Sequence, residues 1–259
     1  ALVRDGRVAS VYRKQLLPNY GVFDEQRYFE SGEETVIAEV GGVRCGLLIC
    51  EDIWAPGPSR AAVAAGAEVL LIINGSPYDT ESQARRERVM ISCAQETGVP
   101  LVYCNMVGGQ DELVFDGGSL VVDGSGEIRV RAPAFEEALL GIELERQPDG
   151  LSVKAGDIAP LLELDASVYK ALVRGIRDYV NKHRFPGIVL GLSGGIDSAL
   201  TLALAVDALG ADRVRTVMMP SRYTADISLQ DAEEMARRLD VRYDVVSIEP
   251  IFASIQEAL

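Results

Sequence analysis

The sequence is poor in the residues that build metal and redox sites. It has one histidine, His183, and four cysteines, and no two cysteines form a CxxC pair. Zinc sites and dithiol centres need paired cysteines or Cys–His clusters. A chain of 259 residues also buries enough apolar surface to fold without a disulfide framework. The composition argues against zinc, dithiol and disulfide chemistry.

The sequence also lacks a basic run and a long apolar run. Its formal net charge is −14, and Glu87 interrupts the densest basic cluster, Arg85, Arg86 and Arg88. Nucleic acids and anionic membranes are bound by basic patches, so neither is an expected partner. The longest apolar stretch, residues 61–73, is broken by a glycine and a glutamate and is too short to span a bilayer. The charged start has no signal-peptide core, which predicts a cytoplasmic protein.

Residues 1–145 are expected to form one domain of short strands and two helices. The nearly continuous apolar run at 43–50 is typical of a strand buried on both faces. Helices are predicted at 59–67 and 81–97. Further strands are predicted at 7–13, 35–40, 69–73, 100–105, 119–123, 128–131 and 139–145.

Residues 146–163 contain several prolines and glycines with little periodicity, which predicts a linker. From 164 to 259 the pattern becomes regular. Helices are predicted at 166–182, 197–209 and 228–239, the last with Ser228 as its N-cap. A buried strand is predicted at 188–191, and further strands at 213–219 and 242–248. Such alternation is typical of a parallel, doubly wound α/β sheet of the Rossmann-like kind.

A glycine-rich loop joins the strand at 188–191 to the helix that follows. Its sequence is Gly191-Leu192-Ser193-Gly194-Gly195-Ile196-Asp197-Ser198. Glycines let the backbone turn sharply and approach a ligand, while the N–H groups at a helix start point at an anion. Ser193 and Ser198 add hydroxyl donors, and Asp197 places a carboxylate where Mg²⁺ on a polyphosphate would sit. The loop predicts a phosphate site.

Three well-known glycine loops do not match this one. A Walker A loop needs a lysine after its glycines, and none follows here. A dinucleotide fingerprint needs the spacing GxGxxG, whereas two residues separate Gly191 from Gly194. Residues 191–195 do satisfy the GxSxG nucleophile elbow, but that fold needs a histidine after the serine, and His183 precedes it.

The loop instead resembles the SGGxDS pyrophosphate loop of the N-type ATP pyrophosphatases. The segment Val-Met-Met-Pro-Ser-Arg-Tyr-Thr at 217–224 is similar to the one that borders the adenosine in NAD synthetases. The resemblance implies that ATP is cleaved between its α and β phosphates to adenylate a carboxylate or carbonyl. It implies ATP binding by residues 191–198 and Thr224, and Mg²⁺ binding by Asp197.

Cys50 ends the apolar run at 43–50 and precedes the polar pair Glu51-Asp52. A thiol at the end of a strand and facing a loop is placed to act as a nucleophile. The other cysteines are expected to be small buried hydrophobic residues: Cys45, Cys93 and Cys104. His183 lies beside the other loop, so a Cys–His dyad is not expected. Any base must then be a carboxylate, and any cationic partner a lysine or arginine.

Two segments resemble the nitrilase family, which uses Glu, Lys and Cys. They are Lys-Gln-Leu-Leu-Pro-Asn-Tyr at 14–20 and Leu-Leu-Ile-Cys-Glu-Asp-Ile-Trp at 47–54, and the nearest form is the glutaminase domain of NAD synthetases. The resemblance implies a partial α-β-β-α sandwich in which Cys50 attacks the glutamine amide and leaves a thioester. Lys14 would stabilise the oxyanion and the thiolate. Tyr20 and Ser76 match positions that bind glutamine.

Two positions depart from the family pattern. The general base, a glutamate, normally lies well before the lysine, and no glutamate precedes Lys14 here. We expect this base upstream of residue 1 and do not assign the role to Glu25. The position six after Ser76, often basic in relatives, is Ser82, and Arg85 is a possible substitute. By resemblance, the chain is truncated at both ends, and it is expected to have little glutaminase activity alone.

The resemblances cover nearly the whole chain and imply one overall reaction. Glutamine would supply ammonia for the ATP-dependent amidation of deamido-NAD to NAD, with AMP, pyrophosphate and glutamate as the other products. The family is typically oligomeric, which implies a homo-oligomer. The alternatives are another amidotransferase with the same ATP loop, or a non-catalytic fragment that only binds nucleotide.

Overall fold

The computed structural model describes residues 1–148 and 150–258, which form two compact units. The first unit consists of residues 1–107 and 115–164. The second consists of residues 108–114 and the chain from Asp165 onward. Asp149, inside the expected linker, and Leu259, at the end of the expected second domain, lie outside the described residues.

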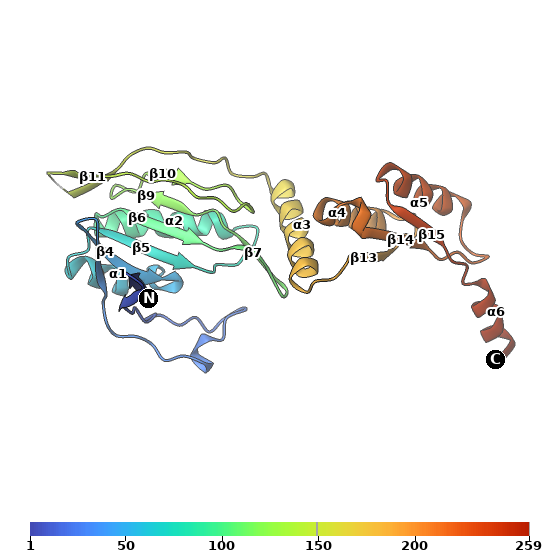
Figure 1. Ribbon diagram of the computed structural model, residues 1–259, viewed down its shortest axis with the longest axis horizontal. Coiled ribbons are helices and arrows are strands. Elements are labelled where there is room, and N and C mark those ends of the chain that lie inside the picture. Colours follow the sequence, from blue (N-terminus) through green and yellow to red (C-terminus); the bar gives the residue numbers. More distant parts are fainter. Residues whose placement is uncertain (149, 259) are drawn as a thin grey trace. The chain divides into compact units, whose positions relative to one another are not determined.

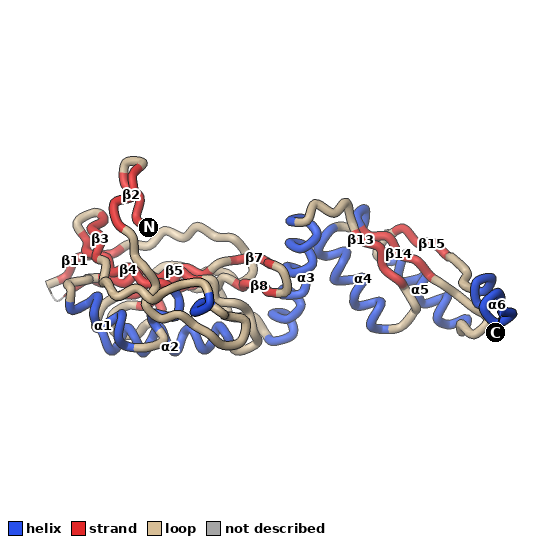
Figure 2. The backbone as a smooth tube through the Cα atoms, turned by 90° about the horizontal axis from the view of Figure 1, so that it is seen from below, coloured by secondary structure: helices blue, strands red, loops and turns tan. Residues whose placement is uncertain are grey.

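The first unit is built on a six-stranded sheet in the order β10-β9-β6-β5-β4-β3 (Figure 1). Its strands are β3 (Ile37–Val40), β4 (Val43–Ile49), β5 (Val69–Asn74), β6 (Leu101–Asn105), β9 (Leu120–Val122) and β10 (Ile128–Arg131). The three central strands β4, β5 and β6 are parallel, and the flanking strands pair with them antiparallel. The helices α1 (Pro56–Ala64) and α2 (Ser82–Thr97) make the two crossovers and cover one face of the sheet (Figure 2).

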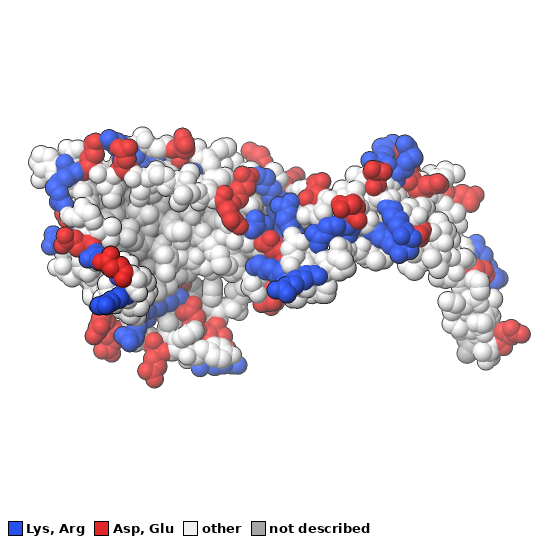
Figure 3. Space-filling view, viewed as in Figure 1, with Lys and Arg blue, Asp and Glu red and all other residues white. Residues whose placement is uncertain are grey.

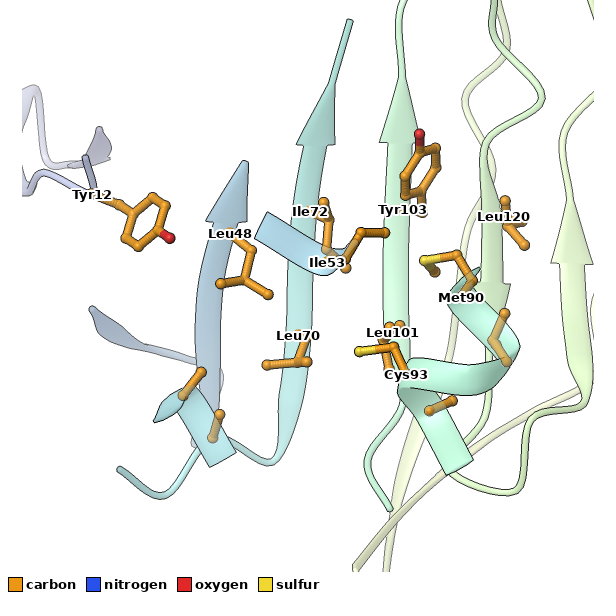
Figure 4. Close-up of a cluster of buried hydrophobic side chains, with 14 residues drawn as sticks. Tyr12, Leu48, Ile53, Leu70, Ile72, Met90, Cys93, Leu101, Tyr103 and Leu120 are labelled. Carbon is orange, nitrogen blue, oxygen red and sulfur yellow. The ribbon is translucent and has the colours of Figure 1, made fainter. Parts of the chain in front are cut away.

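The core of this unit lies between the sheet and the two helices (Figure 4). Side chains alternate between the faces of a strand, so every second residue of β4, β5, β6 and β9 points at α1 and α2. The strand residues that do so are buried: Leu48, Leu70, Ile72, Leu101, Tyr103 and Leu120. They pack against Ala62 of α1 and Met90 and Cys93 of α2. The strand predicted at 43–50 reads as a nearly continuous apolar run because the side chains on its other face are apolar as well.

The opposite face of the sheet is also apolar but more open. Ile73 is 60% exposed, and Cys104 is exposed, so the prediction that Cys104 is buried is wrong. Cys104 lies on β6 between Tyr103 and Asn105, and alternation turns it away from the helices. Few charged side chains lie over the middle of this unit in the view of Figure 3.

Smaller elements surround the sheet. The hairpin of β1 (Leu2–Arg4) and β2 (Arg7–Ser10) precedes it, and the short helices η1 (Glu25–Arg27) and η2 (Cys50–Ile53) carry site residues. A second hairpin, β11 (Leu144–Gln147) with β12 (Gly150–Val153), lies where a linker without periodicity was expected. The strand predicted at 139–145 is wrong for residues 139–143, which are in no strand.

The second unit contains a parallel sheet in the order β13-β14-β15, formed by β13 (Ile188–Gly191), β14 (Val214–Met218) and β15 (Arg242–Val245). Its helices are α3 (Leu164–Lys182), α4 (Ile196–Leu209), α5 (Asp226–Arg238) and α6 (Glu249–Ala258), with η3 (Ala211–Arg213) before β14. Residues of α4 and α5 share one buried cluster with the strands: Leu202, Ala205, Val214, Ala232 and Ala236. The α/β class predicted from the alternating pattern is confirmed.

Two local predictions in this unit are wrong. The strand β13 is not buried on both faces, because Val189 is 70% exposed. Ser228 is not the N-cap of α5, because the helix begins at Asp226 and Ala225 occupies the cap position without a side-chain hydrogen bond. Ser228 lies inside the first turn, where its backbone packs against Gly194.

A hairpin that the sequence did not predict, β7 (Val107–Gln110) with β8 (Leu113–Asp116), supplies residues 108–114 to the second unit. Asp178 on α3 accepts the N–H of Gly109 at 2.6 Å, and Lys182 Nζ donates to the Gly109 carbonyl at 2.5 Å. A side chain at Gly109 would approach the backbone of Gly175 at 3.2 Å. The two glycines therefore let the hairpin lie directly against α3. Among the described residues, no helix is long and apolar enough to cross a membrane.

Ile72 and Ile73 are neighbours on β5 that point to opposite faces, and they test the location of the core. Ile72 is 1% exposed, so Ile72→Ala should lower the free energy of unfolding by about 2–5 kcal/mol through lost burial and a cavity. Ile73→Ala should change it by about 0.5 kcal/mol. Urea denaturation followed by circular dichroism measures both. Equal losses would mean that the face away from α1 and α2 is buried as well.

Candidate functional site

The first site lies at the carboxyl ends of the three parallel strands. Cys50 follows β4, Ser76 lies just after β5, and Asn105 ends β6. Ladder pairing places Ile49 beside Ile73 and Asn74 beside Asn105, so the three strand ends lie at one edge of the sheet. Ligand sites in parallel α/β sheets form at this edge.

Cys50 itself stands at an unusual point of the backbone. Its φ is +46°, which is uncommon for a residue with a Cβ, and it opens η2 directly after the extended Ile49. Such backbone strain is concentrated at functional sites. The Cys50 thiol is partly buried, and Gly75 supplies a backbone hydrogen bond that favours the thiolate.

Lys14 is brought to the thiol and is held there by Glu25. The Lys14 ammonium contacts both carboxylate oxygens of Glu25 at 2.7 Å, and the Lys14 side chain is only 12% exposed. Lys14 is close enough to lower the pKa of Cys50. Because both oxygens of Glu25 are occupied by Lys14, this carboxylate orients the ammonium.

Burial and charged neighbours act on the Cys50 thiol in addition to the Gly75 hydrogen bond. Burial is the largest and raises its pKa, Lys14 lowers it, and Glu51 and Glu25 raise it again. The net result is a raised pKa, so the ligand-free site keeps the sulfur protonated at neutral pH. A thiol is a much weaker nucleophile than a thiolate, and something beyond Lys14 must favour ionisation.

The Asp52 side chain connects the Lys14 segment to the Cys50 turn. It is fully buried and accepts four hydrogen bonds: from the Tyr12 hydroxyl at 2.7 Å and from the backbone N–H groups of Gln15, Leu16 and Ile49 at 2.9–3.0 Å. A buried carboxylate is tolerated only when its oxygens are bonded in this way. Burial, followed by the bond to Asp52, raises the pKa of Tyr12, so its hydroxyl stays a donor.

Tyr20 lies at the exposed side of the thiol. Its hydroxyl donates to both carboxylate oxygens of Glu51 at 2.9 Å, and the side chain is 58% exposed. Burial of the hydroxyl and its bond to Glu51 raise the pKa of Tyr20 to about 12, and Arg85 opposes this rise. The structure thus places Tyr20 and Glu51 beside Cys50, with Arg85 near the Tyr20 hydroxyl.

Ser76 is fixed by the buried residues around it. Its N–H donates to Asn105 Oδ1 at 2.9 Å, and its carbonyl accepts from Asn105 Nδ2 at 3.2 Å. Its hydroxyl and carbonyl each accept from Arg86 at 3.4 Å, and Arg86 forms a buried ion pair with Asp116. Both Arg86 and Asn105 were missed from the sequence.

The two residues considered for the position near Ser76 have other partners. The Ser82 hydroxyl is buried and donates to the Asp79 carbonyl at 2.9 Å at the start of α2. Arg85 is half-buried and pairs with the Asp79 carboxylate, and its charge acts on Tyr20. The arginine that contacts Ser76 is Arg86, one residue further along the helix.

The second site is the loop between β13 and α4. Gly194 has φ +82°, and a Cβ there would lie 2.3 Å from the Ser228 carbonyl, so only glycine fits. Ser198 Oγ accepts the N–H of Ser193 at 3.3 Å and lies 3.1 Å from Ser193 Oγ. Gly195 occupies the N-cap of α4 without a side-chain bond, which leaves the N–H groups at the helix start open to an anion.

The predicted loop residues differ in what they can offer a ligand. Leu192 is 1% exposed and packs in the core, so only its backbone can face a nucleotide. Gly191, Gly195, Ile196 and Asp197 are exposed around it.

Thr224 and Asp197 are the outlying members of the predicted ATP site. Thr224 Oγ1 accepts the N–H of Ser221 at 3.0 Å in the turn after β14. Asp197 lies in the first turn of α4, exposed and without an ion-pair partner in the described part of the chain. No group of three His, Cys, Asp or Glu side chains able to hold a metal exists among residues 1–148 and 150–258. A metal here would have one protein ligand.

Comparison with known families decides the class of the chain. Residues 1–147 match the family model of carbon-nitrogen hydrolases, and residues 168–259 match that of NAD synthase. The chain belongs to the carbon-nitrogen hydrolase family. The predicted fusion of a nitrilase-like domain with a parallel-sheet NAD synthetase domain is confirmed.

Individual relatives agree with both matches. The glutamine-dependent NAD(+) synthetases of Acinetobacter baylyi and Rhodobacter capsulatus are 44% and 47% identical over 259 residues, which is 100% of this chain and 48% and 47% of theirs. A solved glutamine-dependent NAD+ synthetase from Acinetobacter baumannii, in complex with ADP, is 45% identical with a TM-score of 0.93, over 99% of this chain and 48% of that one. The chain spans about half the length of the curated relatives it matches.

A more distant structure shares the fold alone. The synthetase from Cytophaga hutchinsonii is 21% identical with a TM-score of 0.77, over 95% of this chain and 48% of that one.

Lys14 is the cation beside the partly buried Cys50 thiol, and its removal also frees the Glu25 carboxylate, which raises the same pKa. In Lys14→Met the pKa of Cys50 should rise further, because the lowering contribution is lost, and the profile of alkylation against pH should move to higher pH. Alkylation of Cys50 by iodoacetamide at pH 7.5 should slow about three- to tenfold. Mass spectrometry of the Cys50 peptide measures the rate.

The matched control is Lys154→Met, which removes an exposed lysine paired with Glu143 and Glu145. It should leave the Cys50 rate unchanged. Exposed Cys104 provides an internal reference in the same digest. A Lys14→Met variant that labels at the wild-type rate would show that the ammonium does not act on the thiol.

Proposed function

We propose that this chain carries the glutaminase site and the ATP site of a glutamine-dependent NAD synthetase. Residues 1–145 would serve the first reaction and residues 164–259 the second, joined by 146–163. The observation that carries the proposal is Cys50, in a strained backbone at the edge of a parallel sheet, with the Lys14 ammonium held beside it by Glu25. The names of the relatives favour this function over another amidotransferase or a nucleotide-binding fragment.

In the glutaminase reaction, the Cys50 thiolate attacks the side-chain amide carbon of glutamine. Lys14 stabilises the charge that develops on the amide oxygen, and the amide nitrogen leaves as ammonia after gaining a proton. Water then hydrolyses the thioester to glutamate. Tyr20 and Ser76 hold the substrate, and the bonds from Asn105 and Arg86 keep the Ser76 backbone in place.

In the second reaction, ATP binds at residues 191–198 and activates deamido-NAD for attack by ammonia. The backbone N–H groups at the start of α4 and the hydroxyls of Ser193 and Ser198 bind phosphate oxygens. The Acinetobacter baumannii relative was solved in complex with ADP, which supports a nucleotide site in this family. The donor set suits Mg²⁺ carried on the nucleotide, because Mg²⁺ commonly takes one or two carboxylates, with phosphates and water completing its shell. Asp197 would supply that carboxylate, and bound Mg²⁺ would neutralise phosphate charge.

Location and assembly follow from the same proposal. The substrates deamido-NAD, ATP and glutamine are soluble metabolites, so we place the protein in the cytoplasm. The homo-oligomer implied by the family resemblance belongs to this proposal as well. Analytical ultracentrifugation of the purified chain gives its mass in solution.

An electrophilic glutamine analogue should identify the nucleophile. A diazoketone analogue that retains the amino acid end of glutamine should alkylate Cys50 and leave exposed Cys104 unmodified, because only Cys50 lies beside Lys14 and Tyr20. Intact-mass and peptide mass spectrometry detect the single addition.

The label should be absent in Cys50→Ser, should persist in Cys104→Ser, and should be reduced by excess glutamine. Unselective labelling of both cysteines, unaffected by glutamine, would contradict a glutamine site at Cys50.

Asp197 tests the nucleotide site. Asp197→Asn should weaken binding of ATP with Mg²⁺ by about tenfold, or 1.4 kcal/mol, and leave binding of ATP without Mg²⁺ almost unchanged. Isothermal titration calorimetry measures both affinities. Asp226→Asn, which changes the acidic residue in the first turn of the next helix, is the matched control and should bind as the wild type does. If both forms of ATP bound equally well to Asp197→Asn and to the wild type, Asp197 would hold no metal.

A further inference from the structure

The Gly75 N–H is a sheet donor whose neighbouring strand has already ended. β4 stops at Ile49, and η2 begins at Cys50, whose φ of +46° takes the chain out of the sheet. The N–H groups of alternate residues in a strand point to opposite neighbours, and Leu70 of β5 donates to Pro100 on the β6 side. The N–H of each odd-numbered residue from 71 to 75 therefore points toward β4. Because β4 has ended, the Gly75 N–H meets a side chain and is hydrogen-bonded to the Cys50 sulfur.

The direction of this N–H is fixed from the other side of the same peptide unit. The carbonyl of Asn74 accepts the N–H of Met106, directly after β6, at 3.0 Å. A trans peptide points its C=O and N–H in opposite directions. A carbonyl that is bonded on the β6 side thus directs the Gly75 N–H to the β4 side. The hydrogen bond to the sulfur depends on how the ends of β5 and β6 are joined.

Asn105 is the side chain that joins these two strand ends. It is 5% exposed, and its Oδ1 accepts the N–H of Ser76 at 2.9 Å. Its Nδ2 donates to the Ser76 carbonyl at 3.2 Å and to the Gly117 carbonyl at 2.9 Å. The backbone N–H of Asn105 donates to Ser119 Oγ at 2.9 Å, which holds Asn105 in turn. The residue after Gly75 is therefore fixed at both its N–H and its C=O.

A buried ion pair supports the same turn from α2. Arg86 is 1% exposed and pairs with Asp116, which is 3% exposed. The Arg86 guanidinium also donates to the carbonyl and the hydroxyl of Ser76, each at 3.4 Å, and to Gln83 at 2.8 Å. Buried amides and buried charges are costly unless their partners are in place. Their concentration behind one short turn indicates that the geometry of residues 74–76 matters to the site.

Two neighbours favour the thiolate form of Cys50, the Lys14 ammonium and the Gly75 N–H, and they act against burial and two carboxylates. A hydrogen bond weakens steeply when its angle departs from linearity, so the N–H contributes only while its peptide is held in place. The titratable groups that face the sulfur from the surrounding elements are Lys14, Tyr20, Glu25, Glu51 and Tyr103. Asn105 carries no charge, so its replacement leaves these groups unchanged.

We propose that Asn105 is a positioning residue for the nucleophile. It holds the turn at residues 74–76 so that the Gly75 N–H stays on the Cys50 sulfur and favours the thiolate over the thiol. The role rests on the proposed glutaminase function, in which Cys50 attacks the amide. Because Asn105 acts through a backbone N–H, it sets the reactivity of the sulfur toward any small electrophile, with or without an amino acid bound.

The pH profile of Cys50 alkylation by iodoacetamide, read from the Cys50 peptide by mass spectrometry, measures this role. Asn105→Ala should move the profile to higher pH and slow the reaction at pH 7.5 about three- to tenfold, because a hydrogen bond to the thiolate is lost. At the alkaline end the two rates should converge, since the thiolate is then fully formed in both proteins. A merely structural role would loosen the turn, expose the sulfur and change the rate at every pH.

Gly75→Pro removes the N–H itself and tests whether Asn105 acts through it. Asn74 ends an extended strand, which suits the residue before a proline. This variant should show the same shift of the profile. The double variant should shift it no further than Gly75→Pro alone, because the two changes remove one interaction. Shifts that add in the double variant would mean that Asn105 acts on the thiol by another route, and would overturn the proposal.

Ser119→Ala loosens Asn105 without replacing it, so the role stays testable if Asn105→Ala folds poorly. It should give a smaller shift in the same direction. The matched control is Ser59→Ala, which removes a similarly buried polar group from α1 of the same unit and should leave the profile unchanged.

An unshifted profile in Asn105→Ala, with wild-type Cys50 still labelled by the diazoketone analogue of glutamine, would overturn this role and leave the proposed function standing. A wild-type Cys50 that reacts with iodoacetamide but not with the analogue would overturn the proposed function, and the role of Asn105 in it.

Discussion

The geometry of the first site depends on one buried carboxylate, that of Asp52. Its oxygens bind the segment that carries Lys14, through Gln15 and Leu16, and also the last residue of β4, Ile49. Two stretches of chain more than thirty residues apart are thus held by a single side chain. Glu25 then holds the Lys14 ammonium beside a thiol whose burial opposes ionisation. Without this connection, the long lysine side chain would gain more from solvent than from the site.

The sheet explains why the remaining residues gather at the same place. In a parallel sheet the carboxyl ends of neighbouring strands lie at one edge, and the turns after β4, β5 and β6 carry Cys50, Ser76 and Asn105. Asn105 then bonds the backbone of Ser76 at two points, so one strand end fixes the next. The loop after β13 follows the same rule in the second unit, where a parallel strand leads into α4, whose first turn has no side-chain cap. Both sites therefore use the strand-to-helix turn of an α/β sheet.

Periodicity was enough to predict the elements that build this framework. The strands β4, β5 and β6 and the helix α2 agree with the predicted ranges to within one or two residues, because alternation and helical spacing record which face is buried. The same patterns do not say which side chains meet. Glu25 and Asp52 are ordinary acidic residues in the sequence, and only folding places Glu25 on Lys14. Arg85 and Arg86 are adjacent in the chain, but their side chains differ in direction by about 100° around the helix axis. Arg86 therefore contacts Ser76, whereas Arg85 lies near Tyr20. The hairpin β7–β8 was missed because its glycines are needed for close contact with α3, and that contact is visible only in the folded structure.

The two sites solve the problem of charge in different ways. The phosphate loop presents neutral backbone N–H groups and hydroxyls on an exposed surface, and these donors need no compensation when the site is empty. The cysteine site surrounds its sulfur with one ammonium and two carboxylates, in a place where burial already favours the neutral form. Lys14 lowers the pKa of the thiol, but Glu51 and Glu25 oppose it. The charges around the sulfur therefore do not offset its burial, and the empty site favours the protonated thiol.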